Sequence, residues 1–470
     1  MAKFDLAVIG AGASGLSVTA VAAQLGLRVA LIEAGRTGGD CLNVGCVPSK
    51  AILAAARAAG SARRAHLFGI RLPEPEVEWN AVTAHVHGAI AAIAPNDSRE
   101  RYEAFGAQVF AAEAHFVSPD TLAVGQDRLS AKRIVIAAGS RPSVPPLPGL
   151  DVVPYLTNET LFDLQSQPEH LLILGGGPIG LEMADAFAGL GCRVTVVEAE
   201  RIAAREDPEL VAGLRAALAD RGVVFRENAT VDRVERGPVL VLRDGQRIEG
   251  SHLLVATGRQ PALARLGLKA GQVEASPRGI VTDHGLRSIS NRRVFAVGDI
   301  ADPRGIGPRA FTHVGTYHAG IVIRRALFHL PARVNYAALA RVTYTDPELA
   351  QVGLTEAEAR AAGRAVSVLR WPLAENDRAQ TERDPRGLVK LVIERGRVVG
   401  AGILARHAGE MLGTWSLAIS QRLKIRILAD MIVPYPTLAE AGKRAAGSYY
   451  LSALFAPRTK AMVRMLARLP

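Results

Sequence analysis

The sequence predicts an α/β chain with two Rossmann-like dinucleotide-binding domains, followed by a C-terminal α+β domain. Two observations carry this prediction: a βαβ unit with a glycine signature occurs twice, and the pattern of strands and helices changes after about residue 340. A third observation bounds it, because 470 residues exceed a single hydrophobic core and favour two to four domains. The 49% hydrophobic content and 46 glycines are typical of α/β proteins with many tight turns.

The first glycine signature opens the chain. A short apolar strand leads into a helix through Gly10, Gly12 and Gly15. The strand after that helix ends in Glu33. Glycines let the backbone approach a pyrophosphate at a helix N-terminus, and an acidic residue about 20 positions later binds ribose hydroxyls. We therefore expect a dinucleotide at this unit.

The same signature returns in the middle of the chain. Its glycines are Gly175, Gly177 and Gly180, and its second strand ends in Glu198. Two such units predict two dinucleotide sites, and a decayed structural repeat is the alternative. The Glu198 carboxylate would repel the 2′-phosphate of NADP(H), which favours NAD(H). Use of NADP(H) stays open because two arginines lie nearby, Arg201 and Arg205.

Two of the three cysteines, Cys41 and Cys46, lie five residues apart just after the first signature. A regular helix through both would separate them by about 7.5 Å along its axis, too far for a disulfide. We expect Gly45 to adopt an unusual backbone conformation and Pro48 to occupy the first turn of a new helix. Cys46 would then lie near a helix N-terminus, where a thiolate is stabilised. The pair predicts thiol–disulfide exchange, whereas Cys192 is interpreted as a small buried residue.

Composition and charge limit the classes of function. The net charge of +11 comes from basic residues scattered along the chain without a nucleic-acid motif, so we expect no nucleic-acid partner. No apolar run reaches the roughly 18 residues that span a bilayer, and the N-terminal segment lacks the apolar region of a signal peptide. We therefore expect a cytoplasmic protein, and we assign no metal ligands.

Taken together, these motifs resemble those of the class I FAD-dependent pyridine nucleotide–disulfide oxidoreductases, which include lipoamide dehydrogenase, glutathione reductase and mercuric reductase. The resemblance covers essentially the full length and rests on residues 10–33, 41–50, 175–198, 256–259, 298–299 and 345–353. It implies an FAD-binding domain in two parts, 1–152 and 276–338, an NAD(P)-binding domain, 153–275, and a dimerisation domain with a basic tail, 339–470.

The resemblance also implies roles for individual residues. Glu33 would bind the adenosine ribose of FAD, and Asp299 would bind the ribityl chain. Lys50 and Glu182 would form an ion pair beside the flavin ring. Further FAD contacts are implied for Gly10, Gly12, Gly15, Gly39, Asp40, Lys50, Ala114, Gly139 and His313. Contacts to NAD are implied for Gly175, Gly177, Gly180, Glu198 and Gly258.

By the same resemblance, Cys46 faces the flavin as the charge-transfer thiolate and Cys41 is the interchange thiol. The expected activity is that of a homodimeric, dihydrolipoyl dehydrogenase-like NAD(P)H oxidoreductase acting on a small dithiol or disulfide, or on a lipoyl carrier protein. One alternative is a mercuric reductase-like enzyme or an NADH diaphorase that reduces metal ions or quinones. Another is a flavoprotein subunit of a larger complex.

Two departures from the family pattern bear on the chemistry. Tyr435 replaces the histidine of the His-Pro-Thr-x-x-Glu motif, while Glu440 is retained. With an ordinary pKa of about 10, tyrosine is a poor base at neutral pH, so we expect it to donate a hydrogen bond or to protonate a leaving thiolate. Packing at an interface is the alternative. Asp40 replaces threonine and would raise the pKa of the neighbouring thiol unless it is paired.

Mercuric reductase also has tyrosine at this position, but it adds a vicinal cysteine pair near its C-terminus. No cysteine follows Cys192 here, so we expect no relay of that kind.

The segment after Ser452 carries basic residues, Arg458, Lys460, Arg464 and Arg468, and no acidic ones. Apolar residues are interleaved with them, which favours a short amphipathic helix. We expect it to dock on its own dimer rather than on a membrane surface or a partner protein.

Overall fold

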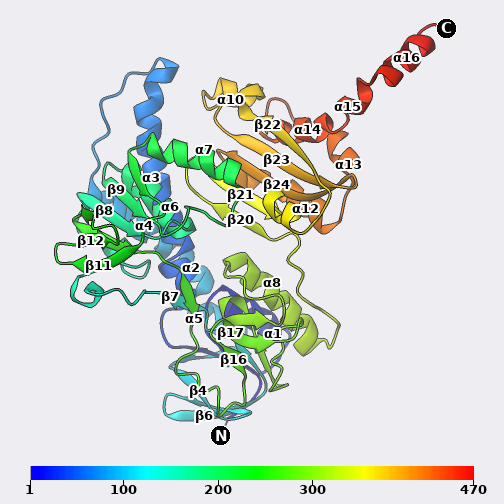
Figure 1. Cartoon of the computed structure of the whole chain (residues 1–470). Helices are drawn as coiled ribbons and strands as arrows, with labels where there is room; N and C mark the ends of the chain where they lie inside the picture. Colours follow the sequence, from blue (N-terminus) through cyan, green and yellow to red (C-terminus); the bar gives the residue numbers. More distant parts are fainter. Residues whose placement is uncertain (1, 470) are drawn as a thin grey trace. The chain divides into compact units, whose positions relative to one another are not determined.

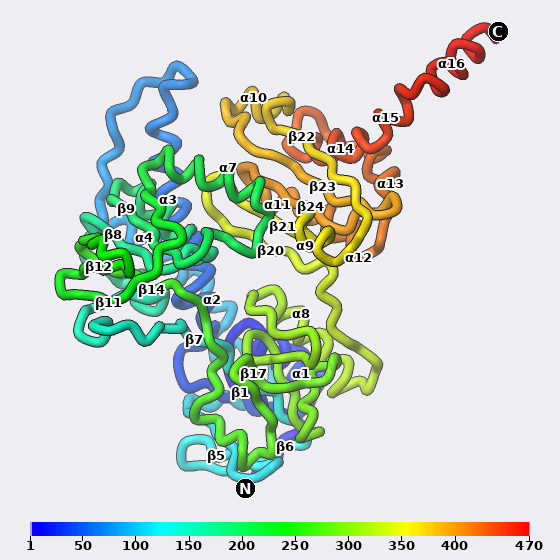
Figure 2. Tube along the Cα trace, in the orientation of Figure 1, coloured from blue at the N-terminus to red at the C-terminus, as the bar shows by residue number. Residues whose placement is uncertain are grey.

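The structure is a computed structural model that describes residues 2–469. The chain forms two compact units, drawn in Figure 1 and traced in Figure 2. Unit 1 comprises Met1–Ala54, Glu78–Gln167 and Leu253–Val334, and unit 2 comprises Ala55–Val77, Pro168–His252 and Asn335–Pro470. The four domain segments expected from the sequence stay a prediction.

Unit 1 is built around a seven-stranded sheet. Its order is β3-β2-β1-β6-β5-β4, and β18 also pairs with β6. Its strands are β1 (Ala2–Ile9), β2 (Val29–Glu33), β3 (Ala107–Ala111), β4 (Ala114–Ser118), β5 (Thr121–Val124), β6 (Asp127–Ile136) and β18 (Val294–Ala296). Strands β1, β2, β3, β6 and β18 are parallel, whereas β4 and β5 join antiparallel. Leu6, Leu31 and Ile134 are fully buried, as the apolar strand runs require.

Helices and short strands complete unit 1. The helices are α1 (Ala13–Gln24), α2 (Gly39–Asn43), α4 (Trp79–Ile93), α5 (Arg99–Ala104) and α8 (Thr312–Val322). The short strands are β7 (Ser140–Pro142), β15 (Arg259–Pro261), β16 (Ala275–Ser276), β17 (Gly279–Thr282) and β19 (Ala301–Pro303). Two elements run across the division between the units, α3 (Cys46–Arg64) and β14 (His252–Val255). The residues after Gly139 and Gly258 form the antiparallel pair β7–β15.

The first part of unit 2 is a second parallel βαβ region. It contains β8 (His170–Leu174), α6 (Pro178–Gly189), β9 (Arg193–Val197), α7 (Pro208–Ala219) and β10 (Val223–Arg226). Strand β9 lies between β8 and β10, parallel to both. A three-stranded antiparallel sheet follows, formed by β11 (Val231–Glu235), β12 (Val239–Leu242) and β13 (Arg247–Glu249).

The remainder of unit 2 is an antiparallel sheet with helices, in the order β20-β21-β24-β23-β22. The strands are β20 (Ala340–Thr343), β21 (Glu348–Gly353), β22 (Ser367–Pro372), β23 (Leu388–Glu394) and β24 (Arg397–Ala405). The helices are α9 (Glu356–Ala361), α10 (Asp377–Thr381), α11 (Ala408–Met411), α12 (Gly413–Ser420), α13 (Ile425–Ala429), α14 (Ala439–Ser448), α15 (Leu451–Leu454) and α16 (Pro457–Leu466). Leu391, Ile403 and Trp415 belong to its core. The predicted fold class is confirmed by these elements and by the structural relatives described below.

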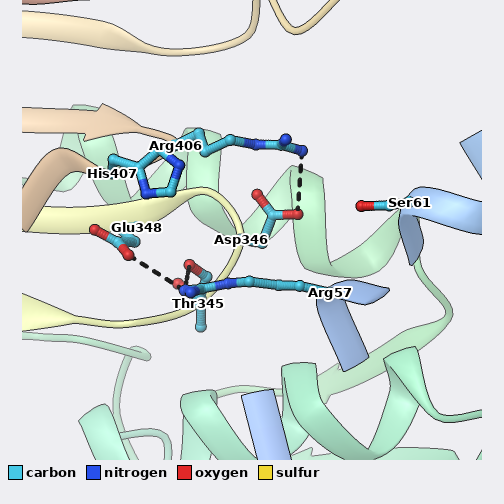
Figure 3. A pocket seen from close by; sticks show the side chains of 7 residues that line it. All are labelled: Arg57, Ser61, Thr345, Asp346, Glu348, Arg406 and His407. Carbon is cyan, nitrogen blue, oxygen red and sulfur yellow. Dashed lines mark hydrogen bonds and ion pairs between the residues drawn. The ribbon is translucent and has the colours of Figure 1, made fainter. Parts of the chain in front are cut away.

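A cluster of ion pairs fastens the end of α3 within unit 2. Arg57 forms an ion pair with Glu348 at 3.2 Å, and Arg221 forms one with Asp346 at 2.9 Å. A cavity of about 70 Å³ lies beside these ion pairs (Figure 3). It is lined by Arg57, Ser61, Thr345, Asp346, Glu348, Arg406 and His407. Because the arginines and carboxylates neutralise one another, we interpret this cluster as structural.

No helix within residues 2–469 combines the length and apolar character needed to cross a membrane.

Candidate active site

The two cysteines lie on separate helices, because the helix through them is interrupted as predicted. Cys41 belongs to α2, which ends at Asn43, and Cys46 is the first residue of α3. The expectation of an unusual conformation at Gly45 is wrong, because its φ lies outside the left-handed region. Glycine is required there for space: a Cβ would lie 2.8 Å from the carbonyl oxygen of Asp40. Pro48 occupies the first turn of α3, where no backbone donor is needed.

The two sulfur atoms differ in their surroundings. Both residues are thiols in this structure, with Cys41 half-buried and Cys46 exposed. A hydrogen bond with Cys46, then burial, then the charge on Cys46 raise the pKa of the Cys41 thiol far above its ordinary value. Consequently the Cys41 thiol keeps its proton at neutral pH.

The position of Cys46 favours that charge. Its Sγ atom lies 3.3 Å from Oγ1 of Thr312, the first residue of α8. Cys46 is itself the first residue of α3, so two helix N-termini meet at this sulfur. The partial positive charge of helix N-termini stabilises a thiolate. Thr312 was not identified from the sequence, although the adjacent His313 was; His313 is exposed and its ring stacks on Phe311.

The first glycine signature forms a tight loop between β1 and α1. A Cβ at Gly10 would collide with the carbonyl of Ala137, and one at Gly15 would collide with the carbonyl of Gly10. At the end of β2, the Glu33 carboxylate accepts hydrogen bonds from the backbone N–H of Ala11 at 2.6 Å and of Gly35 at 2.8 Å. The carboxylate is therefore held beneath the loop.

This loop also touches the start of the redox segment. The N–H of Gly38 donates to the carbonyl of Ala11 at 2.8 Å. A Cβ at Gly39 would lie 2.8 Å from Cα of Gly12. The second glycine of the signature and the residues before Cys41 therefore share one cradle, which explains why small residues occupy both places.

The second signature in unit 2 repeats the geometry of the first. Gly175 has a positive φ of 113°, and a Cβ at Gly180 would collide with its carbonyl. Glu198 accepts from the N–H of Gly176 at 2.7 Å and of Glu200 at 2.9 Å. Helix α6 begins after Gly177 with no side-chain cap and no acidic residue in its first turn. Such a terminus suits a phosphate.

Asp40 is paired with a cation, so its charge is neutralised beside Cys41. Its carboxylate forms an ion pair with Arg259 of β15. Arg259 also donates to Oγ and to the carbonyl oxygen of Ser140, at 2.7 and 2.8 Å. Asn158 accepts from Arg259 at 3.4 Å and donates to the carbonyl of Val44 at 3.0 Å. Arg259 and Asn158 together therefore hold the redox segment on both sides of Cys41.

Asp299 lies at the other end of the same network. The Ser140 hydroxyl donates to its carboxylate at 2.6 Å, and burial raises the pKa of Asp299. The turn that carries it is fixed by His318, whose Nδ1 accepts the N–H of Gly298 at 3.1 Å. Burial lowers the pKa of His318 to about 4, so this ring is neutral at physiological pH. His318 was missed because a lone histidine within an apolar helix carries no motif.

The other expected FAD residues are all in unit 1. Ala114 begins β4, and Gly139 joins β6 to β7 with a positive φ of 66°. Gly258, expected at the NAD site, precedes β15 in unit 1, whereas the other expected NAD residues lie in unit 2. Lys50 belongs to unit 1, where its Nζ donates to Ser49 at 3.3 Å. Glu182 is buried in unit 2 and accepts the N–H of Tyr344 at 3.0 Å, so the Lys50–Glu182 ion pair stays a prediction.

Tyr435 and Glu440 have separate partners in unit 2. The Tyr435 hydroxyl, on a side chain that is 68% exposed, donates to Asp377 at 2.8 Å. That hydrogen bond raises the pKa of Tyr435, so the phenol stays protonated at neutral pH. Glu440 instead forms an ion pair with Arg444, one turn along α14, at 3.1 Å.

Comparison with known proteins identifies the family of the chain. Residues 4–323 match the family described as pyridine nucleotide-disulphide oxidoreductase, and residues 339–446 match its dimerisation domain. The chain belongs to this family. A mercuric reductase from Streptomyces lividans is 38% identical over 461 residues, which cover 95% of this chain and 96% of that protein. A mercuric reductase from Lysinibacillus sphaericus is 33% identical, covering 94% and 82%.

Solved structures agree with this assignment. The Cu(II) complex of the HOCl-induced flavoprotein disulfide reductase RclA from Escherichia coli superposes with a TM-score of 0.84 at 27% identity, covering 93% of this chain and 98% of that one. LpdA from Mycobacterium tuberculosis gives 0.85 at 26% identity, covering 96% and 100%.

Enzymes of the pyridine nucleotide-disulphide oxidoreductase family use FAD and take electrons from NAD(P)H. The first signature fits such a group. Helix α1 begins after Gly12 with no side-chain cap and no acidic residue in its first turn. A side chain at Gly39 would fill the cradle against that loop. The backbone holds Glu33 at the end of β2, the position of the carboxylate that binds a ribose in such units. The exposed Cys46 thiol beside α8 completes this fit.

Proposed function

We propose that this oxidoreductase uses its Cys41–Cys46 pair to reduce a soft, thiol-binding metal ion, with Hg(II) as the representative substrate. The observation that carries the proposal is the asymmetric pair itself. It consists of a half-buried Cys41 thiol, whose pKa is raised first by its hydrogen bond with Cys46, and an exposed Cys46 sulfur at two helix N-termini. Two adjacent sulfur donors are the ligands that soft metal ions prefer.

Tyr435 distinguishes this substrate class from a dithiol. Exchange with a dithiol needs a group that removes a thiol proton, and Tyr435 stays protonated because of its hydrogen bond to Asp377. A metal ion needs no such base, since coordination deprotonates the thiol and releases its proton to water. The Cys41 proton, which the hydrogen bond with Cys46 and burial retain by raising the pKa of Cys41, would leave in this way.

The expected reaction consumes one NAD(P)H for each Hg(II), giving NAD(P)⁺, a proton and Hg(0). When bound, FAD supplies the two-electron relay between the nicotinamide and the cysteine pair. The residues proposed to hold it are Gly10, Gly12, Gly15, Glu33, Gly39, Asp40, Ala114, Gly139, Asp299 and His313, with Lys50 and Glu182 beside the ring. Cys41 and Cys46 hold the metal ion, and the names of the mercuric reductase relatives support this substrate.

For the nucleotide we propose NADH as the preferred donor, held by Gly175, Gly177, Gly180, Glu198 and Gly258. The Glu198 carboxylate, bound to two backbone N–H groups, lies at the end of β9, where a 2′-phosphate would meet its charge. We also propose a homodimer, in agreement with the match to the dimerisation domain.

A small disulfide is the second candidate substrate, because the family is described as disulfide oxidoreductases and RclA is titled a flavoprotein disulfide reductase. The test is NADH oxidation by the FAD-loaded enzyme with Hg(II) in excess thiol, with oxidised glutathione, or with oxidised lipoamide. We expect turnover with Hg(II) in the parent and its loss in Cys41→Ser and in Cys46→Ser. Cys192→Ser, which changes a buried cysteine outside the pair, should keep full turnover. Turnover with a disulfide but not with Hg(II) would select the second candidate. Retention of Hg(II) turnover in Cys46→Ser would indicate a diaphorase.

A further inference from the structure

The segment after α14 lies outside the part of the chain that matches the family's dimerisation domain, which ends at residue 446. It forms α15 (Leu451–Leu454) and α16 (Pro457–Leu466), which continue beyond α14 in Figure 1. None of residues 451–469 is buried. We call residues 451–469 the tail segment.

Helix α16 has two distinct faces. Met462, Met465 and Leu466 follow the i, i+3, i+4 spacing of one helix face and are 50%, 64% and 48% exposed. Lys460 and Arg464 are one turn apart, and each lies two residues before an apolar residue, about 160° around the helix axis. Lys460 and Arg464 therefore lie opposite the apolar row, whereas Arg458 lies at its N-terminal end, one turn before Met462.

Charge is of one sign throughout this part of the chain. Residues 447–469 contain four basic residues, Arg458, Lys460, Arg464 and Arg468, and no acidic residue. Three further apolar side chains are exposed just before α16, namely Leu451, Leu454 and Phe455. The Lys460 ammonium lies 6.0 Å from the centre of the Phe455 ring, so the aromatic and a cation lie together.

We propose that the tail segment binds an anionic lipid surface. An amphipathic helix with basic residues opposite apolar ones lies in the plane of a membrane interface, where the long cationic side chains reach the headgroups. The lipid surface is favoured by the single sign of the charge and by the position of Lys460 and Arg464 opposite the apolar row, and a protein partner becomes an outcome of the test. The segment's own dimer, which the sequence favoured, becomes an outcome of the test.

The test is co-flotation of the FAD-loaded enzyme with vesicles of equimolar phosphatidylcholine and phosphatidylglycerol, or of phosphatidylcholine alone. We expect binding to the anionic vesicles only, and loss of it when residues 451–470 are deleted. Each cation near such a surface contributes about fivefold, so Lys460→Glu with Arg464→Glu should weaken binding at least about 25-fold. Met462→Ser with Met465→Ser should also abolish it.

The matched control is Arg236→Glu with Arg243→Glu, which changes net charge equally at two exposed arginines away from the tail segment. It should bind the anionic vesicles nearly as the parent does. Light scattering and bound FAD report assembly and folding of every variant. The proposal is overturned if the parent enzyme does not float with anionic vesicles, or if both charge reversals weaken binding equally. It is also overturned if deletion instead reduces a dimer to a monomer, which would show that a second copy covers the apolar face.

Discussion

Asp40 and Arg259 form an ion pair that joins the residue before Cys41 to strand β15. The pair matters for the chemistry because an unpaired carboxylate beside a thiol opposes its ionisation. Arg259 thus neutralises the Asp40 charge, for which the sequence alone showed no partner. It also orients the segment, since it contacts Ser140 and Asn158 as well.

Removal of this pairing should change the ionisation of the cysteine pair. In Arg259→Met the pH at which the reduced enzyme reacts half-maximally with iodoacetamide should rise by about one unit, because Asp40 becomes unpaired. Asp40→Asn combined with Arg259→Met should restore the parent value. An equal shift in the single and the double variant would show that Arg259 acts only through the fold.

The unequal sulfur atoms give a second prediction. The hydrogen bond with Cys46 and its charge raise the pKa of Cys41, so Cys46→Ser should lower it towards its ordinary value. We expect Cys41 in that variant to be alkylated faster at pH 8 than in the parent dithiol, as mass spectrometry of the labelled peptide can measure. A slower reaction would contradict the assignment of the charge to Cys46.

Glu198 should control the choice of nucleotide. Glu198→Gln removes the negative charge facing a 2′-phosphate while keeping an acceptor for the N–H of Gly176. We expect the ratio of kcat/KM for NADH over NADPH to fall about tenfold, a change of about 1.4 kcal/mol. Glu33→Gln is the matched control, since Glu33 has the same backbone contacts in unit 1 and should affect FAD retention instead. An unchanged nucleotide ratio in Glu198→Gln would remove this role.

Replacing Gly45 tests whether the close approach of Asp40 requires glycine at this position of the redox loop. Gly45→Ala places a Cβ 2.8 Å from the carbonyl of Asp40, so the loop must move, and we expect a destabilisation of about 1–3 kcal/mol and slower reduction of Hg(II). Gly60→Ala on α3 meets nothing within 4 Å and should be neutral or stabilising by up to about 1 kcal/mol. Thermal unfolding compares the two, and equal melting temperatures would refute the steric argument.

His318 should make stability depend on pH. Its folded pKa of about 4 lies below the unfolded value of about 6.5, so the unfolded chain binds a proton first as the pH falls. The contribution of His318 to the free energy of unfolding is therefore fully present above pH 6.5. It is lost between pH 6.5 and 4, by about 3 kcal/mol in total. His318→Gln, which can still accept from Gly298, should lose less stability over this range. Identical pH dependence in calorimetry would exclude His318 as the source.

Local sequence patterns predicted the two glycine signatures, the break between Cys41 and Cys46 and the change to an α+β region. They succeeded because backbone geometry forces glycine and acidic residues into fixed spacings. They did not show Arg259 opposite Asp40, Thr312 beside Cys46 or Asp377 beside Tyr435, because these partners are distant in sequence and carry no spacing rule. The reason for Gly45 was also wrong, since proximity of Asp40, rather than backbone conformation, selects glycine there.

The most direct test of the account is anaerobic reduction of the FAD-loaded enzyme with NADH, followed by rapid mixing with Hg(II). NADH should produce the long-wavelength absorbance of a thiolate beside the flavin, and one equivalent of Hg(II) should abolish it in the parent and in Cys192→Ser. Cys46→Ser should show neither change. Absence of the band with both NADH and NADPH, or the same response in Cys46→Ser, would contradict the role of the Cys41–Cys46 pair.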